Sequence, residues 1–313
     1  MRAQIEALAE ELRHLRASGM ERVFVSEETL ERLRRAAGKA RSETVEPEQE
    51  PVNEPEREAE VRSFAVSADA LGARKGAPGA GAGLRWDGQP MAPLPEPPVV
   101  KLPKGSKAEQ MAWLRDLVLN CATCREHVRP GRKVVFGVGS EEAEIFFCGE
   151  GPGADEEKQG EPFVGPAGQL LTKIIQAMGL TREQVYIGNI MKWRPEMPSE
   201  WGNREPTLQE VEFSLPYLRA QLEIVRPKVI VALGKTAVNG LLGHDPLRKM
   251  GAVRGRWQEF AGVPLMPTFH PSYLLRNAAL AVKRQVWEDI MKVMEKAGMK
   301  VSEKQRGFFL SAK

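Results

Sequence analysis

Five short apolar runs alternate with helix-patterned segments in the second half of the chain, and this alternation constrains the fold more than any other feature. The runs are 134–138, 145–148, 185–190, 229–233 and 263–269. Between several of them, apolar residues recur every three or four positions, as on one face of a helix. Strands that alternate with helices form βαβ units on a parallel sheet with helices on both faces. The sequence therefore predicts a three-layer α/β/α domain with a central, mostly parallel sheet.

Composition divides the 313 residues into four segments. Residues 1–37 have helical periodicity and are expected to form a small helical hairpin, an appendage to the main domain. Residues 38–105 are rich in Pro, Glu, Ala and Gly and cannot bury enough apolar surface to order themselves, so we expect a disordered linker. The α/β domain then spans 106–298, and 299–313 form a C-terminal tail.

The overall charge and the cysteine content limit the class of protein. The formal net charge is only +3, which permits nucleic-acid binding without demanding it. Three cysteines do not make a disulfide framework and favour a reducing cytosol. Because the sequence has neither a signal-peptide pattern nor the run of ~20 apolar residues that a membrane span needs, we expect a soluble, cytoplasmic protein.

Ligands of open α/β sheets bind outside the carboxyl ends of the strands, where this chain has the loops 149–168, 189–206 and 269–277. The first loop begins Gly149-Glu-Gly-Pro-Gly, in which Gly151 allows close approach of the backbone to a ligand. A dinucleotide site is disfavoured, because Pro152 has no amide donor and no acid ends the following strand. Phe163, later in the loop, either stacks on a flat ligand or plugs the space beneath the loop.

The other two loops carry further polar candidates. Asn189 ends a predicted strand and presents a donor and an acceptor side by side, which suits the edge of a nucleobase, although an Asn here could instead cap its own loop. His270 follows the last strand and is held by Pro271. After it, two leucines beside a serine and an arginine look like a wedge with phosphate anchors: Ser272, Leu274, Leu275 and Arg276.

Taken together, these motifs resemble the uracil-DNA glycosylase superfamily, most closely the family-4 bacterial and archaeal enzymes. The resemblance covers about residues 108–297 and rests on six segments in the family's order: 149–157, 160–171, 185–189, 203–207, 226–234 and 268–277. It implies a DNA-repair glycosylase that flips a uracil out of DNA and hydrolyses its N-glycosidic bond, leaving an abasic site. The alternative is a non-catalytic module on the same fold that binds DNA or nucleotides.

The resemblance also implies roles for individual residues. Phe163 would stack on the uracil, Asn189 would bind its O4 and N3–H, and His270 would donate to O2 and stabilise the departing anion. An acid of the first loop, Glu150 or Glu156, would orient the attacking water.

Three positions depart from the pattern of the family or of its superfamily. The better-known members of the superfamily have an aspartate where this chain has Gly151, which we assign to the base-binding loop. Family-4 enzymes resemble one another in carrying four cysteines for a [4Fe–4S] cluster; Cys121 and Cys124 match two of them, but Trp193 and Ser214 stand at the other two places. We therefore predict that the cluster is absent and that Trp193 packs in its place.

The resemblance implies uracil-containing DNA as the ligand. From the sequence itself we expect no membrane, a monomeric catalytic domain, and an N-terminal hairpin that is a candidate docking element for another protein.

Overall fold

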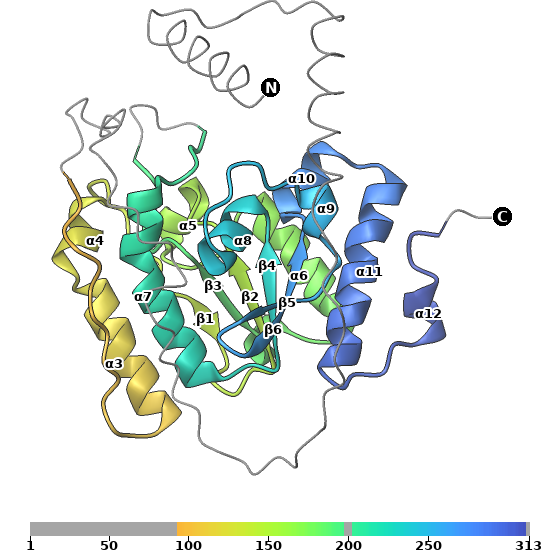
Figure 1. Cartoon of the computed structure of the whole chain (residues 1–313), viewed down its shortest axis with the longest axis horizontal. Coiled ribbons are helices and arrows are strands. Elements are labelled where there is room, and N and C mark those ends of the chain that lie inside the picture. Colours follow the sequence, from red (N-terminus) through yellow and green to blue (C-terminus); the bar gives the residue numbers. More distant parts are fainter. Residues whose placement is uncertain (1–92, 197–201, 311–313) are drawn as a thin grey trace, which may run out of the picture. The chain divides into compact units, whose positions relative to one another are not determined.

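A mixed six-stranded sheet forms the centre of the computed structural model, which describes residues 93–196 and 202–310 (Figure 1). The strands are β1 (Val138–Gly139), β2 (Ile145–Gly149), β3 (Tyr186–Asn189), β4 (Val229–Leu233), β5 (Gln258–Phe260) and β6 (Val263–Thr268). Their order across the sheet is β1-β3-β2-β4-β6-β5. The four inner strands are parallel, and β1 and β5 pair antiparallel at the two edges. The predicted mostly parallel sheet is confirmed.

Helices cover both faces of this sheet. They are α3 (Lys107–Leu119), α4 (Ala122–Glu126), α5 (Ala154–Gln159), α6 (Pro166–Met178), η2 (Arg182–Gln184), α7 (Leu208–Val225), α8 (Lys235–Leu242), α9 (Met250–Val253), α10 (Pro271–Arg276), α11 (Leu280–Lys296) and α12 (Glu303–Arg306). One apolar core gathers residues of α3, α7 and α8, and a second gathers those of α6, α10 and α11. Together with the sheet they form the predicted three layers.

The strand β2 shows why two separate cores form. Successive side chains of a strand point to opposite faces of the sheet. Phe146 and Cys148 accordingly enter the core under α3 and α7, while Ile145 and Phe147 enter the core under α6 and α11. All of β2 is buried, so its sequence is continuously apolar rather than alternating.

The first described helix, α3, begins directly after Ser106. The side chain of Ser106 accepts a hydrogen bond from the Glu109 amide, and the Glu109 carboxylate accepts one from the Ser106 amide at 2.8 Å. This reciprocal pair satisfies amide groups that the first turn leaves without helical partners. The helix then packs its buried face, Met111, Leu114 and Val118, against α7.

Two strand predictions need correction. Of the run 134–138, only Val138 belongs to β1, because Phe136 directs its carbonyl to the side chains of Gln221 (2.9 Å) and Lys192 (3.4 Å) rather than to a neighbouring strand. The edge strand β5 was not predicted, since it is only three residues long and two of them are exposed.

Both ends of the predicted domain also need correction. Residues 93–105 were expected to be linker, yet Leu94, Val100 and Leu102 pack against the core. The predicted tail contains α12, and Gln305 anchors it by accepting from Trp287 Nε1 and donating to the Ala177 carbonyl at 2.8 Å. The domain therefore begins before residue 106 and extends past 298. The predicted hairpin at 1–37 and most of the linker lie outside the described residues.

Among the helices of the described ranges, none combines the length and the apolar character required to cross a lipid bilayer.

Candidate active site

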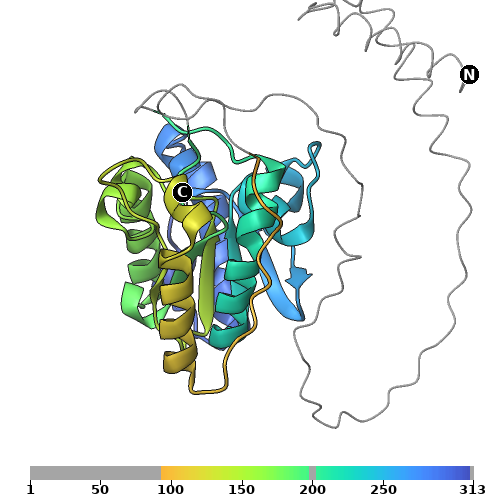
Figure 2. The same cartoon turned by 90° about the vertical axis from the view of Figure 1, so that its left-hand side faces the viewer.

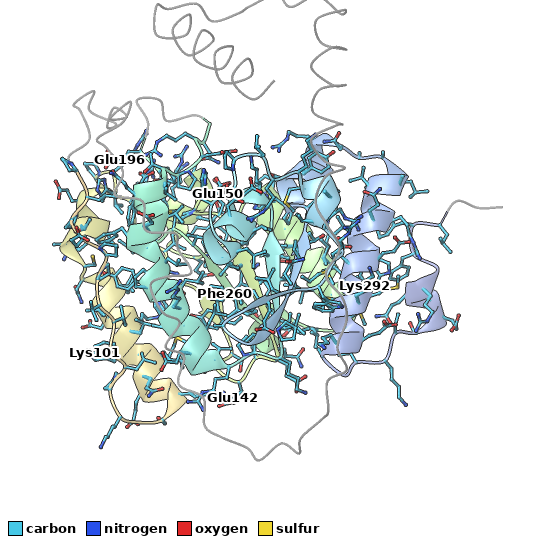
Figure 3. The ribbon with its side chains drawn as sticks, viewed as in Figure 1. Lys101, Glu142, Glu150, Glu196, Phe260 and Lys292 are labelled. Carbon is cyan, nitrogen blue, oxygen red and sulfur yellow. The ribbon has the colours of Figure 1, made fainter. Side chains whose placement is uncertain are left out.

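A pocket of about 400 Å³ opens at the carboxyl ends of the parallel strands. All three predicted loops contribute to its wall: the loop after β2, the end of β3 with Asn203–Glu205, and the segment after β6. Residues that follow β4 complete it. Glu142, which precedes β2, and Glu150, which follows it, lie toward opposite ends of this strand, and the pocket is at the end of Glu150 (Figure 3). The structure thus brings Glu150, Glu156, Phe163, Asn189 and His270 to one site.

Asn189 is the last residue of β3 and is held rigidly. Its side chain is only 3% exposed, and the buried Lys192 ammonium donates to its backbone carbonyl at 2.9 Å. Its side-chain oxygen is buried and has no hydrogen-bond partner among the described residues. A buried acceptor of this kind costs free energy unless a ligand satisfies it. The side chain is therefore suited to receive a donor from a bound ligand.

Phe163 lines the pocket from a strained backbone position. Its φ of 55° lies in the left-handed region, which non-glycine residues rarely adopt. Arg182 holds this conformation by donating to the carbonyls of Phe163 (3.0 Å) and Pro162 (2.8 Å). Gly168 is required beside it, since a Cβ there would overlap the Phe163 carbonyl. The ring is 6% exposed and packs in the core as well as lining the pocket, so the two predicted roles are not exclusive.

Gly149 allows the aromatic ring and the amide to meet. It pairs with Asn189 in the β2–β3 ladder, and a Cβ on it would overlap both Asn189 Oδ1 and the Phe163 ring. The ring centroid of Phe163 in turn lies 5.7 Å from that of His270, tilted by 32°. Side chains from the loop after β2, from the end of β3 and from the segment after β6 therefore face one small volume.

His270 is the N-cap of α10, and its neighbours fix its tautomer. The Ser272 backbone amide donates to His270 Nδ1 at 3.1 Å, and an amide cannot accept, so Nδ1 carries no proton. The proton of the neutral ring is then on Nε2. Burial, helped by the nearby Arg276 charge, lowers the pKa of His270 to about 4. Near neutral pH the pocket contains an uncharged imidazole that donates from Nε2.

The two candidate acids have different surroundings. Burial raises the pKa of Glu150, and the nearby Glu205 charge raises it further, while a hydrogen bond from Thr236 lowers it. Glu156 accepts from three backbone amides: those of Gly153 (3.1 Å), Val164 (3.0 Å) and Gly165 (3.0 Å). These three hydrogen bonds hold the loop in its conformation and occupy the Glu156 carboxylate. Glu150 is the acid that remains available to a ligand.

The predicted wedge needs correction at one of its two leucines. Leu274 is only 6% exposed and belongs to the core beneath α10, because it lies on the inner side of this helix. Leu275 is 49% exposed and remains a candidate. Arg276 is exposed at the pocket wall and remains a candidate phosphate contact. The hydroxyl of Ser272 instead lies within hydrogen-bond distance of His270 Nδ1, at 2.8 Å, so it contacts the histidine. Gly151 lines the pocket beside Met191.

Thr236 was missed by the sequence reasoning. It stands in Gly234-Lys-Thr at the carboxyl end of β4 and contacts Glu150. The rule that selected the other three loops also applies to this strand end, so the signal was present in the sequence. Gly234 has a φ of 90°, and a Cβ added to it would lie only 3.0 Å from the His270 Cβ. The backbone of this segment therefore passes close to His270.

The cysteine pair lies away from this pocket. Cys121 caps α4, and its sulfur accepts from the Cys124 amide at 3.4 Å. Trp193 is fully buried beside α4 and α7: its ring stacks on His127 at 5.2 Å and meets the edge of Phe213 at 5.8 Å. Within the described residues, no three His, Cys, Asp or Glu side chains are grouped as metal ligands.

Comparison with known proteins identifies the family. The profile of the uracil DNA glycosylase superfamily matches residues 136–291. The chain is 42% identical over 188 residues to the type-4 uracil-DNA glycosylase of Thermotoga maritima, covering 60% of this chain and 94% of that protein. It is 39% identical over 189 residues to the type-4 uracil-DNA glycosylase of Archaeoglobus fulgidus, covering 58% and 91% respectively. These similarities, together with the predicted fold, show that the chain belongs to the uracil-DNA glycosylase superfamily.

Proposed function

We propose that this protein hydrolyses the N-glycosidic bond of a uracil flipped out of DNA, leaving an abasic site. The observation that carries the proposal is the convergence of an unsatisfied Asn189 acceptor and a His270 Nε2–H donor on one pocket next to an aromatic ring. A base in a stacked helix is unreachable, so the enzyme extrudes it at a cost of a few kcal/mol. Stacking on Phe163 and the polar contacts offset that cost.

Asn189 provides the discrimination. Its Oδ1 accepts from uracil N3–H, and its Nδ2 donates to O4. Cytosine has the reverse pattern: an acceptor at N3, where uracil has a donor, and a donor at C4, where uracil has the O4 acceptor. Both groups of the rigid amide would then be buried without partners, which is the kind of penalty that gives the strongest discrimination between similar substrates.

His270 stabilises the leaving group. Breaking the bond between C1′ and N1 places negative charge on the uracil, and the neutral imidazole donates from Nε2 to O2 where that charge develops. A preorganised donor of this type contributes about 3–4 kcal/mol to transition-state stabilisation. Because the donor is already neutral and oriented by Ser272, it requires no rearrangement during the reaction.

Glu150 orients the water that attacks C1′, and its charge stabilises the cationic sugar. The Thr236 hydroxyl is directed to this carboxylate and opposes the rise in its pKa that burial causes. Substituting each acid tests this choice. Glu150→Gln should lower the single-turnover rate by at least about 100-fold with unchanged or higher stability, because it removes a charge that burial disfavours.

Glu156→Gln should instead affect stability more than activity. It weakens three hydrogen bonds to the loop, so we expect a lower melting temperature and a smaller loss of rate. If Glu156→Gln abolished uracil release while the melting temperature stayed unchanged, the assignment of Glu150 would be wrong.

The residues near Cys121 do not fit a [4Fe–4S] cluster. Such a cluster is held by four thiolates, and only two of the four matching positions are cysteines. The buried, neutral side chains of Trp193 and Ser214 occupy the other two positions. We propose that the protein folds and acts without the cluster. Iron and sulfide analysis of protein expressed in iron-rich medium tests this, and about four of each per chain would overturn it.

The remaining assignments follow from the family and the sequence. We propose that Leu275 fills the space left by the flipped base and that Arg276 contacts the backbone. From the sequence, we also propose that the catalytic domain is monomeric, that the protein is cytoplasmic, and that residues 1–37 dock another protein.

A gel assay for alkali-labile strand breaks tests the function. An oligonucleotide with a single uracil, incubated with the wild-type protein and then treated with alkali, should break at the uracil, and matched strands with cytosine or thymine should stay intact. Asn189→Ala and His270→Ala should each lower the rate by at least about 100-fold, with DNA affinity nearly unchanged. Binding without any cleavage by the wild type would instead identify a non-catalytic module.

A further inference from the structure

A second pocket, of about 700 Å³, carries a strong positive charge. We call it the basic pocket, and we call the pocket that contains Asn189 and His270 the base pocket. The basic pocket is formed by α3, α4, the segment after α4 and the end of α5. Figure 2 turns this side of the molecule toward the viewer, with α3 and α4 in yellow at the front. Its charged residues are Arg115, Arg125, Arg129, Arg132, Lys133 and Glu161. Five cations against one carboxylate favour an anionic ligand with more than one charge.

Contacts within the protein orient several of these cations without neutralising them. Arg115 donates to the Gly137 carbonyl at 3.2 Å and lies over the Phe136 ring at 5.2 Å. Lys133 donates to the Gln159 carbonyl at 3.3 Å. Carbonyl groups and aromatic rings carry no net charge, so both side chains keep their positive charge in the pocket.

Arg132 has a charged partner, but it shares that partner. Its Nε lies 3.7 Å from Glu157 Oε1, while Arg194 binds the same oxygen at 2.9 Å. One carboxylate therefore faces two guanidinium groups, and the pocket retains a positive excess.

The short helix α5 connects this pocket with the active site. Gly153 and Glu156, at its start, line the base pocket, and Gln159 and Gly160, at its end, line the basic pocket. Six residues of helix span about 9 Å. One DNA strand advances about 3.4 Å per nucleotide. A strand with its uracil in the base pocket can therefore reach the basic pocket roughly three nucleotides away.

We infer that this basic pocket binds phosphates of the DNA strand about three or more nucleotides from the excised uracil. The inference rests on the proposed function, which supplies the strand. Arginine and lysine at such a distance contact no part of the base and give no discrimination between uracil and cytosine. They hold the flanking backbone, so their effect should depend on strand length and on salt.

The test uses Arg125→Glu/Lys133→Glu, two exposed positions of the pocket. The matched control is Lys300→Glu/Lys304→Glu, which changes the charge equally at two exposed positions next to and within α12, in the opposite helical layer. Affinity is measured by fluorescence anisotropy on two single strands with a central uracil, of about 5 and about 19 nucleotides. The lengths are chosen because the basic pocket lies roughly three nucleotides from the uracil, so only the longer strand can reach it. Salt is varied between about 50 and 200 mM.

For the 19-mer, we expect the pocket variant to bind at least about tenfold more weakly than wild type. The slope of log affinity against log salt should become shallower by roughly 1.4, the contribution of two single-strand phosphates. The 5-mer should be bound within about twofold of wild type, because it is too short to reach the pocket. The control variant should match wild type on both strands.

Three results would overturn the inference: an unchanged 19-mer affinity, equal weakening on both strands, or equal weakening by the control. An unchanged affinity would instead favour an acidic protein as the ligand of the pocket. If the charge reversal prevents folding, Arg125→Gln/Lys133→Gln gives the same comparison with half the change in charge. Failure of the wild type to release uracil would refute the proposed function separately, since the binding comparison does not depend on cleavage.

Discussion

Acidification provides a direct test of the lowered pKa of His270. Its pKa of about 4 keeps about nine-tenths of the imidazole neutral at pH 5, whereas an ordinary pKa near 6.5 would leave only about 3% neutral. The ring should thus stay neutral, with Nδ1 as an acceptor, across most of the range in which an exposed histidine titrates. The sign follows from burial, which disfavours the charged ring.

The assay is an NMR titration of protein labelled with ¹⁵N-histidine. The chain has four histidines, and His270→Gln assigns the signal of interest by its loss. We expect a midpoint near pH 4 and ring nitrogen shifts of the tautomer protonated at Nε2. A midpoint near 6.5, or a proton on Nδ1, would refute the reasoning.

Stability should follow the same titration. The unfolded chain takes up a proton at His270 first as the pH falls, so the free energy of unfolding should decrease from about pH 6.5 to about pH 4 and lose no more from this group below that. The loss from this group is about 3 kcal/mol. His270→Gln should remove this part of the pH dependence, as measured by urea unfolding. An identical pH dependence in both proteins would contradict the pKa.

Two further predictions use the geometry of the pocket and of α10. Gly149→Ala places a methyl group against Asn189 and Phe163, so uracil release should fall by at least about 100-fold while the protein still folds; a normal rate in the strand-cleavage assay would count against the arrangement. Leu274→Ala should destabilise the protein by about 2–5 kcal/mol, whereas Leu275→Ala should change stability by less than about 0.5 kcal/mol and slow uracil release from duplex DNA. Equal stabilities of the two leucine variants in chemical unfolding would show that their burial is misassigned.

The strands and most helices could be predicted because their signals are local. β2 and β4 are short, continuously apolar runs, and α3 begins at a serine with a glutamate three positions later. The run 134–138 failed for a reason that is not local. Its carbonyl at Phe136 bonds to Gln221, which is distant in the sequence.

The candidate site could be predicted to the level of its residues but only partly to the level of their roles. The strand-end rule and the resemblance to the family brought Phe163, Asn189 and His270 together. The division of labour between Glu150 and Glu156 could not be predicted, because it depends on which backbone amides the folded loop directs at each carboxylate. Likewise, the sequence cannot distinguish Leu274 from Leu275, since only the orientation of α10 buries one and exposes the other.

The sequence by itself predicted the family, the three-layer architecture and the candidate residues that line the pocket, because apolar periodicity and ordered motifs are properties of the chain alone. The tertiary structure decided the protonation state of His270, since a pKa depends on burial and on charges that only folding brings near. It also decided that five cations line one pocket about one short helix away from the active site, because they come from separate segments of a chain whose net charge is only +3. Charge distribution in space, unlike charge count, is a property of the fold.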